Sequence, residues 1–442
     1  MKNLTAILCL ICIALGASAE RVKVRLFAKN SIELINISFD LGTYNLYDGD
    51  SLTIATEVGN DKSVELTPNG KQVHVSIDGY DYGNFPSVVF SATDTACILC
   101  LNPRNAKQRT YEGNLIVNVG KDGKLLIVND VEFETYIAGV VQSEIYGTQS
   151  DIFRVQAIIS RTWALKNIHK HQKDGYNFCD QVHCQAYLNR CVRPDIMLGT
   201  MQSCGMTIVD KDERLIETPF HSNSGGQTAN SEDVWRSAVP YLRSVPDTFS
   251  YHMRQSEWVK VIDETKWLNY FSKKHNLDIS NDSVRNELLT FSQSQRKARL
   301  CGVPLTRIRT DFQLKSTFFS VLHDSTTQRI TLSGHGFGHG VGLSQEGTIR
   351  MVGLGIAYDS IIHHYYTGSH IHYDKVHAHA YIDNYIRQIA QIIEEDKKQS
   401  TQTKSKKDDW LGRLFRVRDR EEREEVYDPA SEEFDSDWQY DW

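Results

Sequence analysis

After its first twenty residues, the 442-residue sequence contains no apolar run long enough to cross a bilayer. It also lacks an excess of positive charge, because its formal net charge at pH 7 is -7. This balance gives no general case for nucleic-acid binding, so we expect no nucleic acid among the partners. We find no internal repeat, and the length suggests one large domain or two to three ordinary ones.

Residues 1–19 have the features of a cleavable secretory signal. Lys2 supplies a basic start, an apolar run follows, and the small residues at 17–19 form a cleavage site. A lipoprotein signal that ends at Cys12 is the alternative, although Ile11 is a poor residue before a modified cysteine. We therefore expect an exported protein that acts in the periplasm or at the cell envelope.

A fully paired set of cysteines is missing as well. Removal of the signal takes away two of the nine cysteines, and an odd number cannot all pair. In an oxidising compartment this argues against a simple disulfide scaffold and leaves thiols that could bind a metal. The cysteines that remain are Cys97, Cys100, Cys179, Cys184, Cys191, Cys204 and Cys301.

The pattern along the chain favours an α+β fold, with β-rich and helical lobes around a substrate cleft. Short alternating runs predict N-terminal strands, including a hairpin with Asp122-Gly123 in its turn. Later segments with helical spacing predict a core that carries a helical insertion. The expected divisions are the signal peptide at 1–19, a β-rich region at 20–127, a core at 128–374 with the insertion at about 248–300, and a helical, charged and partly disordered tail at 375–442.

The tail offers one short amphipathic stretch, "WLGRLFRVR" at 410–418. Such a stretch could touch a partner or a membrane surface, and it is the only route to membrane contact that we expect. A disordered, solubilising tail is the competing interpretation, because a charged linker precedes the stretch.

Glu144 is placed where a carboxyl group could act as a general acid. We expect a helix that begins at Asn129 as N-cap, with Glu132 three residues later. Glu144 follows Val140 by four residues and Val141 by three, so it shares the face of the apolar stripe. Burial there would raise its pKa, as a general acid requires near neutral pH. The alternative is that Glu144 sits at the helix end and points to water.

A cysteine–histidine loop follows in "HKHQKDGYNFCDQVHCQAY", residues 169–187. Cys179, His183 and Cys184 lie within six residues, with His169 and His171 just upstream. Thiolate and imidazole ligands suit zinc, which prefers four of them in a tetrahedron. The spacing differs from the common paired motifs, so a disulfide such as Cys184 to Cys191 is the alternative.

The segment "TPFHSNSGGQTANSEDVW", residues 218–235, combines paired glycines with small polar residues. Its hydrogen-bonding groups could face a polar ligand, although a surface loop has the same composition. Ser222 or Ser224 could also be a nucleophile with His339 as base. The Gly-x-Ser-x-Gly elbow of such hydrolases is absent, which argues against this alternative.

The segment "GHGFGHGVGLSQEG", residues 334–347, places His335 and His339 among six glycines. Glycine at this density argues against a helix and lets a backbone approach a ligand closely. Ser344 and Gln345 add polar groups. We therefore favour substrate contact over a metal site for this segment.

Four ordered blocks of the sequence resemble the stage II sporulation protein D family, whose relatives include the LytB amidase-enhancer proteins. The blocks are "VNDVEFETYIAGVVQSEI", "RVQAIISRTWALKN", "FCDQVHCQAY" and "GHGFGHGVGLSQEGTIRMVGLGIAYDSIIHHYYTG". Together they cover residues from about 110 to 247 and from 315 to 370.

The resemblance implies a peptidoglycan lytic transglycosylase, which cuts between N-acetylmuramic acid and N-acetylglucosamine without adding water, and here on strands without stem peptides. It assigns the catalytic glutamate to Glu144 and a zinc loop, with a structural zinc, to Cys179, His183 and Cys184, with His171 as a weaker fourth ligand. Because His183 and Cys184 are adjacent, one of them could instead lie outside the coordination sphere and support a ligand. The expected glycan-binding residues are Arg161, Ser222, Ser224, Gly225, Gly226, Gln227, His335, His339, Ser344 and Gln345.

Two competing functions remain open at this point. The chain could be a non-catalytic peptidoglycan-binding protein that activates a cell-wall amidase, or a zinc hydrolase with His335 and His339 as ligands. Ile145 and Tyr146 depart from the Met-Pro that is common in the family. The signal peptide, the insertion and the acidic tail also depart from it, and they put a sporulation role in doubt more than the chemistry.

Overall fold

The computed structural model describes residues 21–49 and 52–375, so the expected signal peptide and nearly all of the expected tail lie outside the described residues. The described chain divides into two compact units. Unit 1 holds the residues up to Glu144 and then Asn167–Gly205, and unit 2 holds Ile145–Lys166 and Met206–Tyr373. Sheets and helices are both present, which confirms the α+β class. No helix in the described ranges is both long enough and apolar enough to span a membrane.

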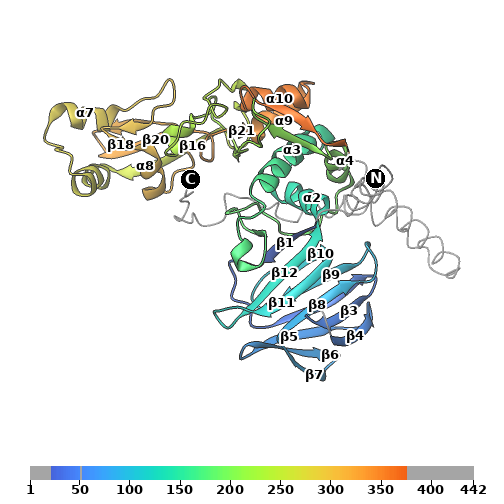
Figure 1. Ribbon diagram of the computed structural model, residues 1–442. Coiled ribbons are helices and arrows are strands. Elements are labelled where there is room, and N and C mark those ends of the chain that lie inside the picture. The colour runs from blue at the N-terminus through green and yellow to red at the C-terminus, as the bar shows by residue number, and fades with distance from the viewer. Residues whose placement is uncertain (1–20, 50–51, 376–442) are drawn as a thin grey trace, which may run out of the picture. The chain divides into compact units, whose positions relative to one another are not determined.

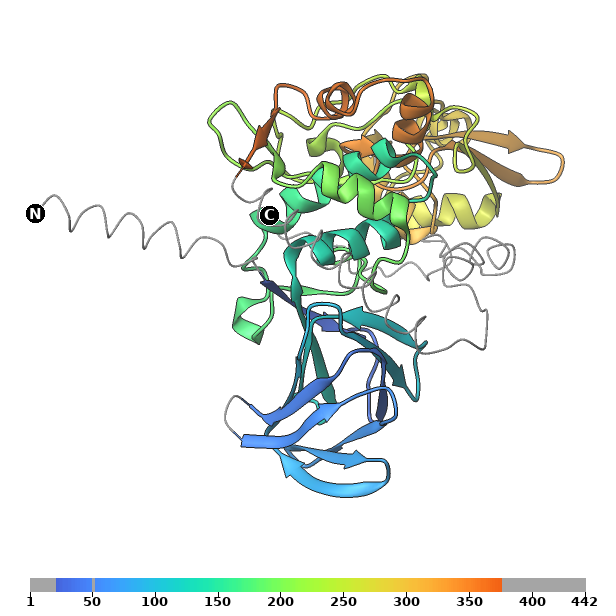
Figure 2. The same ribbon diagram turned by 90° about the vertical axis from the view of Figure 1, so that its right-hand side faces the viewer.

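Unit 1 is built on two sheets, drawn as the blue-to-cyan strands of Figures 1 and 2. The orders are β13-β1-β12-β11-β8-β3-β4 and β10-β9-β2-β5-β6-β7. Phe39 of β2 packs its ring 5.4 Å from Tyr44 of β3 and 6.5 Å from Phe90 of β8, so the two sheets share one core. The strands are β1 Arg21–Leu26, β2 Ile35–Leu41, β3 Tyr44–Asp48, β4 Leu52–Val58, β5 Val64–Asn69, β6 Gln72–Ile77, β7 Tyr80–Phe85, β8 Ser87–Ala92, β9 Ile98–Pro103, β10 Arg109–Glu112, β11 Asn114–Val119, β12 Leu125–Glu132 and β13 Phe178–Cys179.

The predicted hairpin is confirmed, because β11 and β12 pair antiparallel and Gly123 in their turn has a φ of 75°. The predicted N-cap at Asn129 is wrong, since this residue lies within β12. Its buried amide instead donates to the carbonyl oxygens of Glu112 and Asn114. Pairing of β12 with both β1 and β11 outweighs the local capping pattern, and the helix begins at Phe133.

Helix α2 (Phe133–Glu144) follows β12 directly and buries the predicted apolar stripe. It also packs against α4 (Pro194–Gln202) of the same unit. A Cβ at Gly139 would lie 2.5 Å from the ring of Tyr187, so only glycine lets the loop approach the helix this closely. Tyr136 stacks on Phe178 with ring centroids 5.4 Å apart. These contacts join the helix to the cysteine–histidine loop.

Unit 2 contains helix α3, which buries Ile152, Val155 and Ile159. Thr162 of this helix accepts a hydrogen bond from the backbone N–H of Ile208, which ties α3 to β14. The elements of unit 2 are α3 Ser150–Lys166, β14 Met206–Val209, β15 Phe220–His221, α5 Ser231–Val234, β16 Glu257–Asp263, α6 Glu264–Asn269, α7 Asp282–Thr290, β17 Arg299–Leu300, β18 Val303–Pro304, α8 Leu305–Asp311, β19 Phe319–Asp324, β20 Arg329–His335, β21 Leu343–Ser344, α9 Gln345–Gly353, α10 Tyr358–Tyr365 and β22 His370–Tyr373.

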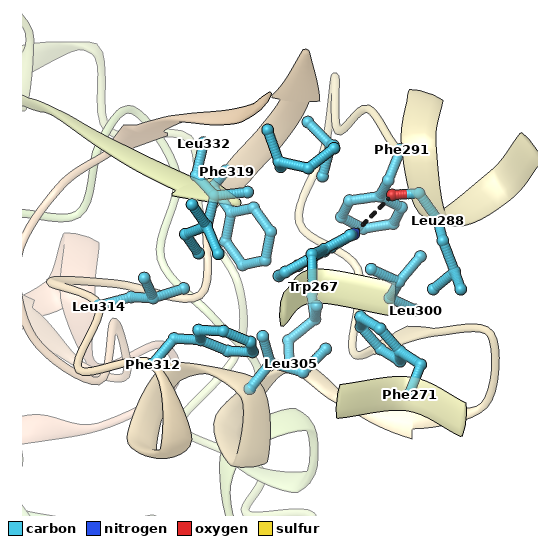
Figure 3. Close-up of a cluster of buried hydrophobic side chains, with 14 of the residues drawn as sticks. Trp267, Phe271, Leu288, Phe291, Leu300, Leu305, Phe312, Leu314, Phe319 and Leu332 are labelled. Carbon is cyan, nitrogen blue, oxygen red and sulfur yellow. Dashed lines mark hydrogen bonds between the residues drawn. The ribbon is translucent and has the colours of Figure 1, made fainter. Parts of the chain in front are cut away.

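The segment expected as a helical insertion forms part of a mixed subdomain, residues 257–335, here called the inserted subdomain. It contains α6 and α7, but also β16, which pairs antiparallel along its whole length with β20. The three-stranded sheet β16-β20-β19 and the helices enclose their own apolar core. Figure 3 shows Trp267 within this core, with its indole N–H donating to the carbonyl oxygen of Leu288 at 3.0 Å.

Candidate active site and metal-binding cluster

The last turn of α2 is held by the loop that follows the cysteines. Three consecutive side chains of the helix accept hydrogen bonds from backbone N–H groups of this loop. Ala186 N–H donates to Glu144 Oε1 at 2.6 Å, and Leu188 N–H donates to Ser143 Oγ at 3.1 Å. The residue before Ser143, Gln142, accepts a hydrogen bond at Oε1 from the N–H of Val192 at 2.8 Å. The carboxyl group of Glu144 is therefore fixed by the backbone of the loop.

Glu144 is only partly buried as a residue, but desolvation raises its pKa to about 7, against the lowering effect of the Ala186 N–H. A carboxyl group of this kind is part protonated at neutral pH, so it can donate a proton and then take one back. The structure thus combines the two placements that the sequence left open: Glu144 ends the helix, and its carboxyl group is desolvated.

The four expected metal ligands lie together in unit 1. One donor atom each from His171, Cys179, His183 and Cys184 lies within 4.8 Å of all the others. The Sγ atoms of Cys179 and Cys184 are 3.6 Å apart, and Cys184 Sγ lies 3.5 Å from His171 Nε2 and 3.6 Å from His183 Nδ1. A tetrahedron with zinc–sulfur bonds of about 2.3 Å and zinc–nitrogen bonds of about 2.0 Å has edges of about 3.3–3.8 Å. The donor set and its spacing therefore fit one zinc ion.

Neighbouring carboxylates orient this cluster. Asp174 lies 3.5 Å from His171 Nδ1, which leaves the Nε2 of that ring facing the sulfur atoms. Asp180 is fully buried and accepts hydrogen bonds from the N–H groups of Phe27 and Ala28 and from the guanidinium of Arg109. The conformation that brings adjacent His183 and Cys184 to one point is a turn closed by the Cys184 N–H and the Gln181 carbonyl oxygen at 2.8 Å.

The cysteines of the described residues are all free thiols, so the alternative of a disulfide from Cys184 to Cys191 is not borne out. The hydrogen bond from Cys184 holds the pKa of Cys179 well below its usual range. A thiolate at Cys179 is the form that binds a metal ion.

In unit 2, the Ser-Gly-Gly loop rests on a buried polar network. Ser224 Oγ donates to Asp247 Oδ2 at 2.7 Å and lies 2.9 Å from Ser250 Oγ. Tyr365 donates to the other oxygen of Asp247 at 3.0 Å. Burial raises the pKa of Asp247, although the Ser224 and Tyr365 donors oppose this effect. The hydroxyl of Ser224 thus supports the loop and has no imidazole partner there.

The paired glycines allow close packing on this network. Gly225 and Gly226 have φ of 71° and 106°, and a Cβ at Gly226 would lie 2.3 Å from the ring of Tyr251. Arg296 of the inserted subdomain donates to the carbonyl oxygens of Ser224 and Gln227, each at 2.6 Å. Hydrogen bonds from the inserted subdomain therefore hold the loop in place, and most polar groups of the loop already have hydrogen-bond partners.

The two histidines of the glycine-rich segment have different environments. His339 Nε2 lies 2.9 Å from the carbonyl oxygen of Phe220, and its Nδ1 accepts from the N–H of Val341. Both nitrogens are engaged, and burial lowers its pKa to about 3. His339 is thus poorly placed to act as a base or metal ligand, which weakens the zinc-hydrolase and serine-nucleophile alternatives. His335 contacts the ring of Phe318, and its nitrogens form no hydrogen bond with the described residues.

The other expected binding residues occupy mostly structural positions. Ser344 is the N-cap of α9, where its hydroxyl accepts from the N–H of Gly347, and Gln345 is buried beside Gln156. Arg161 is fully buried and donates to the carbonyl oxygen of Met206, a position unsuited to glycan contact. The hydroxyl of Ser222 has no partner among the described residues.

Sequence reasoning missed two buried carboxylates of unit 2, Asp247 and Glu346. Glu346 accepts hydrogen bonds from the hydroxyl of Tyr146 at 2.7 Å, the amide of Asn223 at 2.7 Å and the N–H of Gln255 at 3.0 Å. The only local signal for Glu346 is its place directly after Ser344-Gln345. Asp247 has no local signal, because its partners lie 23 and 118 residues away.

Residues 121–203, which include Glu144 and all four cluster residues, match the family model described as "SpoIID: Stage II sporulation protein". A stage II sporulation protein D of Bacillus subtilis (strain 168) is 27% identical over 264 residues, which is 55% of this chain and 75% of the relative. The protein of the same name from Bacillus amyloliquefaciens is 27% identical over 266 residues, 54% of this chain and 74% of the relative.

A third relative carries a different name. An amidase enhancer of Bacillus subtilis (strain 168) is 26% identical over 288 residues, which is 53% of this chain and 40% of the relative. The chain therefore matches less than half of that protein's length. Together these matches confirm the resemblance that the four sequence blocks predicted.

Proposed function

Starting from the match to stage II sporulation and amidase-enhancer proteins, which supports a cell-wall related function, we propose that this chain is a peptidoglycan lytic transglycosylase. It cleaves the bond between N-acetylmuramic acid and N-acetylglucosamine without water and leaves anhydro-muramic ends. The observation that carries the proposal is the carboxyl group of Glu144, with its pKa raised to about 7 and its position fixed by the Ala186 N–H.

Glu144 would act twice in this reaction. In its protonated form it donates a proton to the glycosidic oxygen as positive charge develops on the muramic ring. As a carboxylate it then accepts the proton of the ring's own primary hydroxyl, which closes the anhydro ring. A hydrolytic glycosidase usually needs a second carboxylate to activate water. The buried carboxylates Asp247 and Glu346 already accept several hydrogen bonds, which supports the single-carboxylate route.

His171, Cys179, His183 and Cys184 would hold a structural zinc ion, since four protein ligands leave no open coordination position. The ion would stabilise the loop whose Ala186 N–H orients Glu144. Ser222 and His335 remain the expected glycan-binding side chains with unengaged groups. The preferred substrate would be glycan strands without stem peptides, and the protein would act after export, at the cell envelope.

The test uses the chain without residues 1–19, incubated with intact peptidoglycan and with peptidoglycan stripped by an amidase. Mass spectrometry of the products should show anhydro-muramic ends for the wild type and none for Glu144→Gln. Asp151→Asn, an exposed carboxylate on α3, is the matched control and should retain full activity. Reducing ends from the wild type would overturn the proposal in favour of hydrolysis.

Activation of a cell-wall amidase is the second candidate, and the amidase-enhancer relative favours it. In this case the chain would bind peptidoglycan without cleaving it and would raise the rate of an added amidase. Glu144→Gln would then leave the stimulation unchanged. Binding without cleavage by the wild type, together with stimulation, would replace the transglycosylase proposal with this one.

A further inference from the structure

A second group of metal-ligating side chains lies on the two-stranded sheet of β14 and β22 in unit 2. His370 and His372 alternate along β22, so both project from the same face. The antiparallel register sets His370 opposite Val209 and His372 opposite Thr207, which are both buried. The histidine side chains themselves are 45% and 53% exposed, so they form the outer surface of this sheet.

The turn after β14 brings a carboxylate to these two rings. Glu213 Oε1 lies 2.9 Å from His370 Nε2, and Glu213 Oε2 lies 3.7 Å from His372 Nδ1. The neighbouring Arg214 forms ion pairs with Asp210 and Asp212. Within the described residues, the side chain of Glu213 therefore interacts with the two histidines and with no cation of Lys or Arg.

We propose that His370, His372 and Glu213 form a second binding site, for a divalent transition-metal ion of the zinc class. Two imidazoles and a carboxylate are a donor set that zinc uses when its fourth position is open to water. With metal–ligand bonds of about 2.0–2.2 Å, neighbouring ligand atoms lie about 3.3–3.5 Å apart. The separations of 2.9 Å and 3.7 Å involve the two different oxygens of Glu213. Among the described residues, only the cluster of unit 1 already gathers three or more donor atoms within 4.8 Å of one another, so an ion here requires side-chain rotations that bring the two imidazoles together at Glu213.

The sequence around this site strengthens the proposal. Four of the chain's 16 histidines fall in the ten residues 370–379. Two of them, His377 and His379, repeat the His-x-His spacing but lie outside the described residues. Short histidine-rich tracts of this kind are typical metal-binding sequences. An ordinary surface ion pair would need only one histidine beside Glu213 and would contribute little to stability.

This inference does not depend on the proposed catalytic activity, and its test needs no activity measurement; the expected metal count also includes the zinc proposed for the cluster of unit 1. The full secreted chain is stripped with a chelator, loaded with zinc and analysed for metal per chain after removal of free ions. We expect two zinc ions in the wild type and one in the double variant His370→Asn/His372→Asn. Glu213→Gln should weaken the binding of the second zinc ion about tenfold. His363→Ala, an exposed histidine of α10, should retain both ions.

A direct footprint separates this site from the neighbouring histidines. Zinc should slow chemical acylation of His370 and His372 by at least about tenfold, read by mass spectrometry of peptides, and leave His363 unaffected. A His377→Asn/His379→Asn variant should keep the protection of the described pair. Equal zinc contents in the wild type and in the double variant His370→Asn/His372→Asn, or no protection of these two histidines by zinc, would overturn the proposal.

Discussion

The polar segments that the sequence singled out are used differently in the two units. In unit 1, four ligand atoms converge within 4.8 Å, and Glu144 accepts one backbone N–H while its pKa is raised to about 7. In unit 2, the hydroxyl of Ser224 and both ring nitrogens of His339 are bonded to the protein itself. Unit 1 thus keeps reactive groups available, whereas the two segments of unit 2 use similar residue types to stabilise their own conformation.

This difference shows why glycine-rich polar segments are ambiguous in sequence. The backbone around Gly336, Gly338 and Gly340, where φ is positive, needs hydrogen-bond partners. Backbone groups of neighbouring segments supply them. An exposed segment that binds a ligand could have the same composition. The candidate glycan contacts of unit 2 are therefore reduced to Ser222 and His335, together with exposed backbone groups.

Replacement of Glu144 by Gln should have the largest effect, because it removes the proton donor. The rate of glycan cleavage should fall by about 10²–10⁴-fold, measured by release of soluble glycan fragments. The fold should persist, since an amide oxygen can still accept the Ala186 N–H. Cleavage within a factor of two of the wild type would show that unit 1 does not carry the chemistry.

Loss of the metal cluster should have the next largest effect, because structural zinc sites contribute on the order of 10 kcal/mol of binding free energy to folding. Cys184→Ser should lower the free energy of unfolding by several kcal/mol and release zinc, measured by denaturant titration and metal analysis. The loop then no longer fixes Glu144, so activity should fall as well. Cys301→Ser, a half-buried thiol outside the cluster, is the control. Equal stability of the two variants would contradict a structural metal.

The two histidines of the glycine-rich segment offer the sharpest contrast within unit 2. His339→Ala should lower the free energy of unfolding by about 2–3 kcal/mol, because it leaves a buried carbonyl and N–H unpaired. His335→Ala should change stability by less than about 1 kcal/mol and should weaken binding to glycan strands. Thermal unfolding and a sedimentation binding assay check the two effects. If the effects were reversed, the assignment of these two histidines would be wrong.

The smallest effect concerns pH. The folded-state pKa of Glu144 is raised from 4.5 to about 7, so the native state keeps its proton longer than the unfolded chain. Relative to Glu144→Gln, the wild type should lose stability as pH rises from about 4.5 to about 7 and change little above that. After discount for solvent screening, the difference is on the order of 1 kcal/mol. Denaturant titrations at several pH values measure the difference in free energy of unfolding between the wild type and Glu144→Gln. A relative loss of wild-type stability that grows as the pH falls would have the wrong sign.

The sequence alone predicted the parts of the structure that depend on local pattern. The β-rich region, the buried stripe of α2 and the nearness of Cys179, His183 and Cys184 follow from spacing. The choice of His171 as the fourth member of that group rested on the family resemblance. The sequence alone could not predict which strands pair when they lie far apart in the chain. The register of β16 with β20 joins residues about 70 positions apart and changed a helical insertion into a mixed subdomain.

Long-range hydrogen bonds account for the remaining differences. Asn129 fits the local pattern of an N-cap, but its backbone lies in a strand that pairs with neighbouring strands on both sides. The ion pair between Asp180 and Arg109, which anchors the cysteine loop, spans 71 residues. No local pattern identifies partners at such separations.

The central claim is that Glu144 drives cleavage without water, and isotope labelling tests it most directly. Cleavage is carried out in water enriched in heavy oxygen, and the new muramic ends are analysed by mass spectrometry. We predict that these ends carry an anhydro ring and no label, because the ring's own hydroxyl is the nucleophile. Labelled reducing ends that disappear in Glu144→Gln would show a hydrolase and would contradict the proposed mechanism.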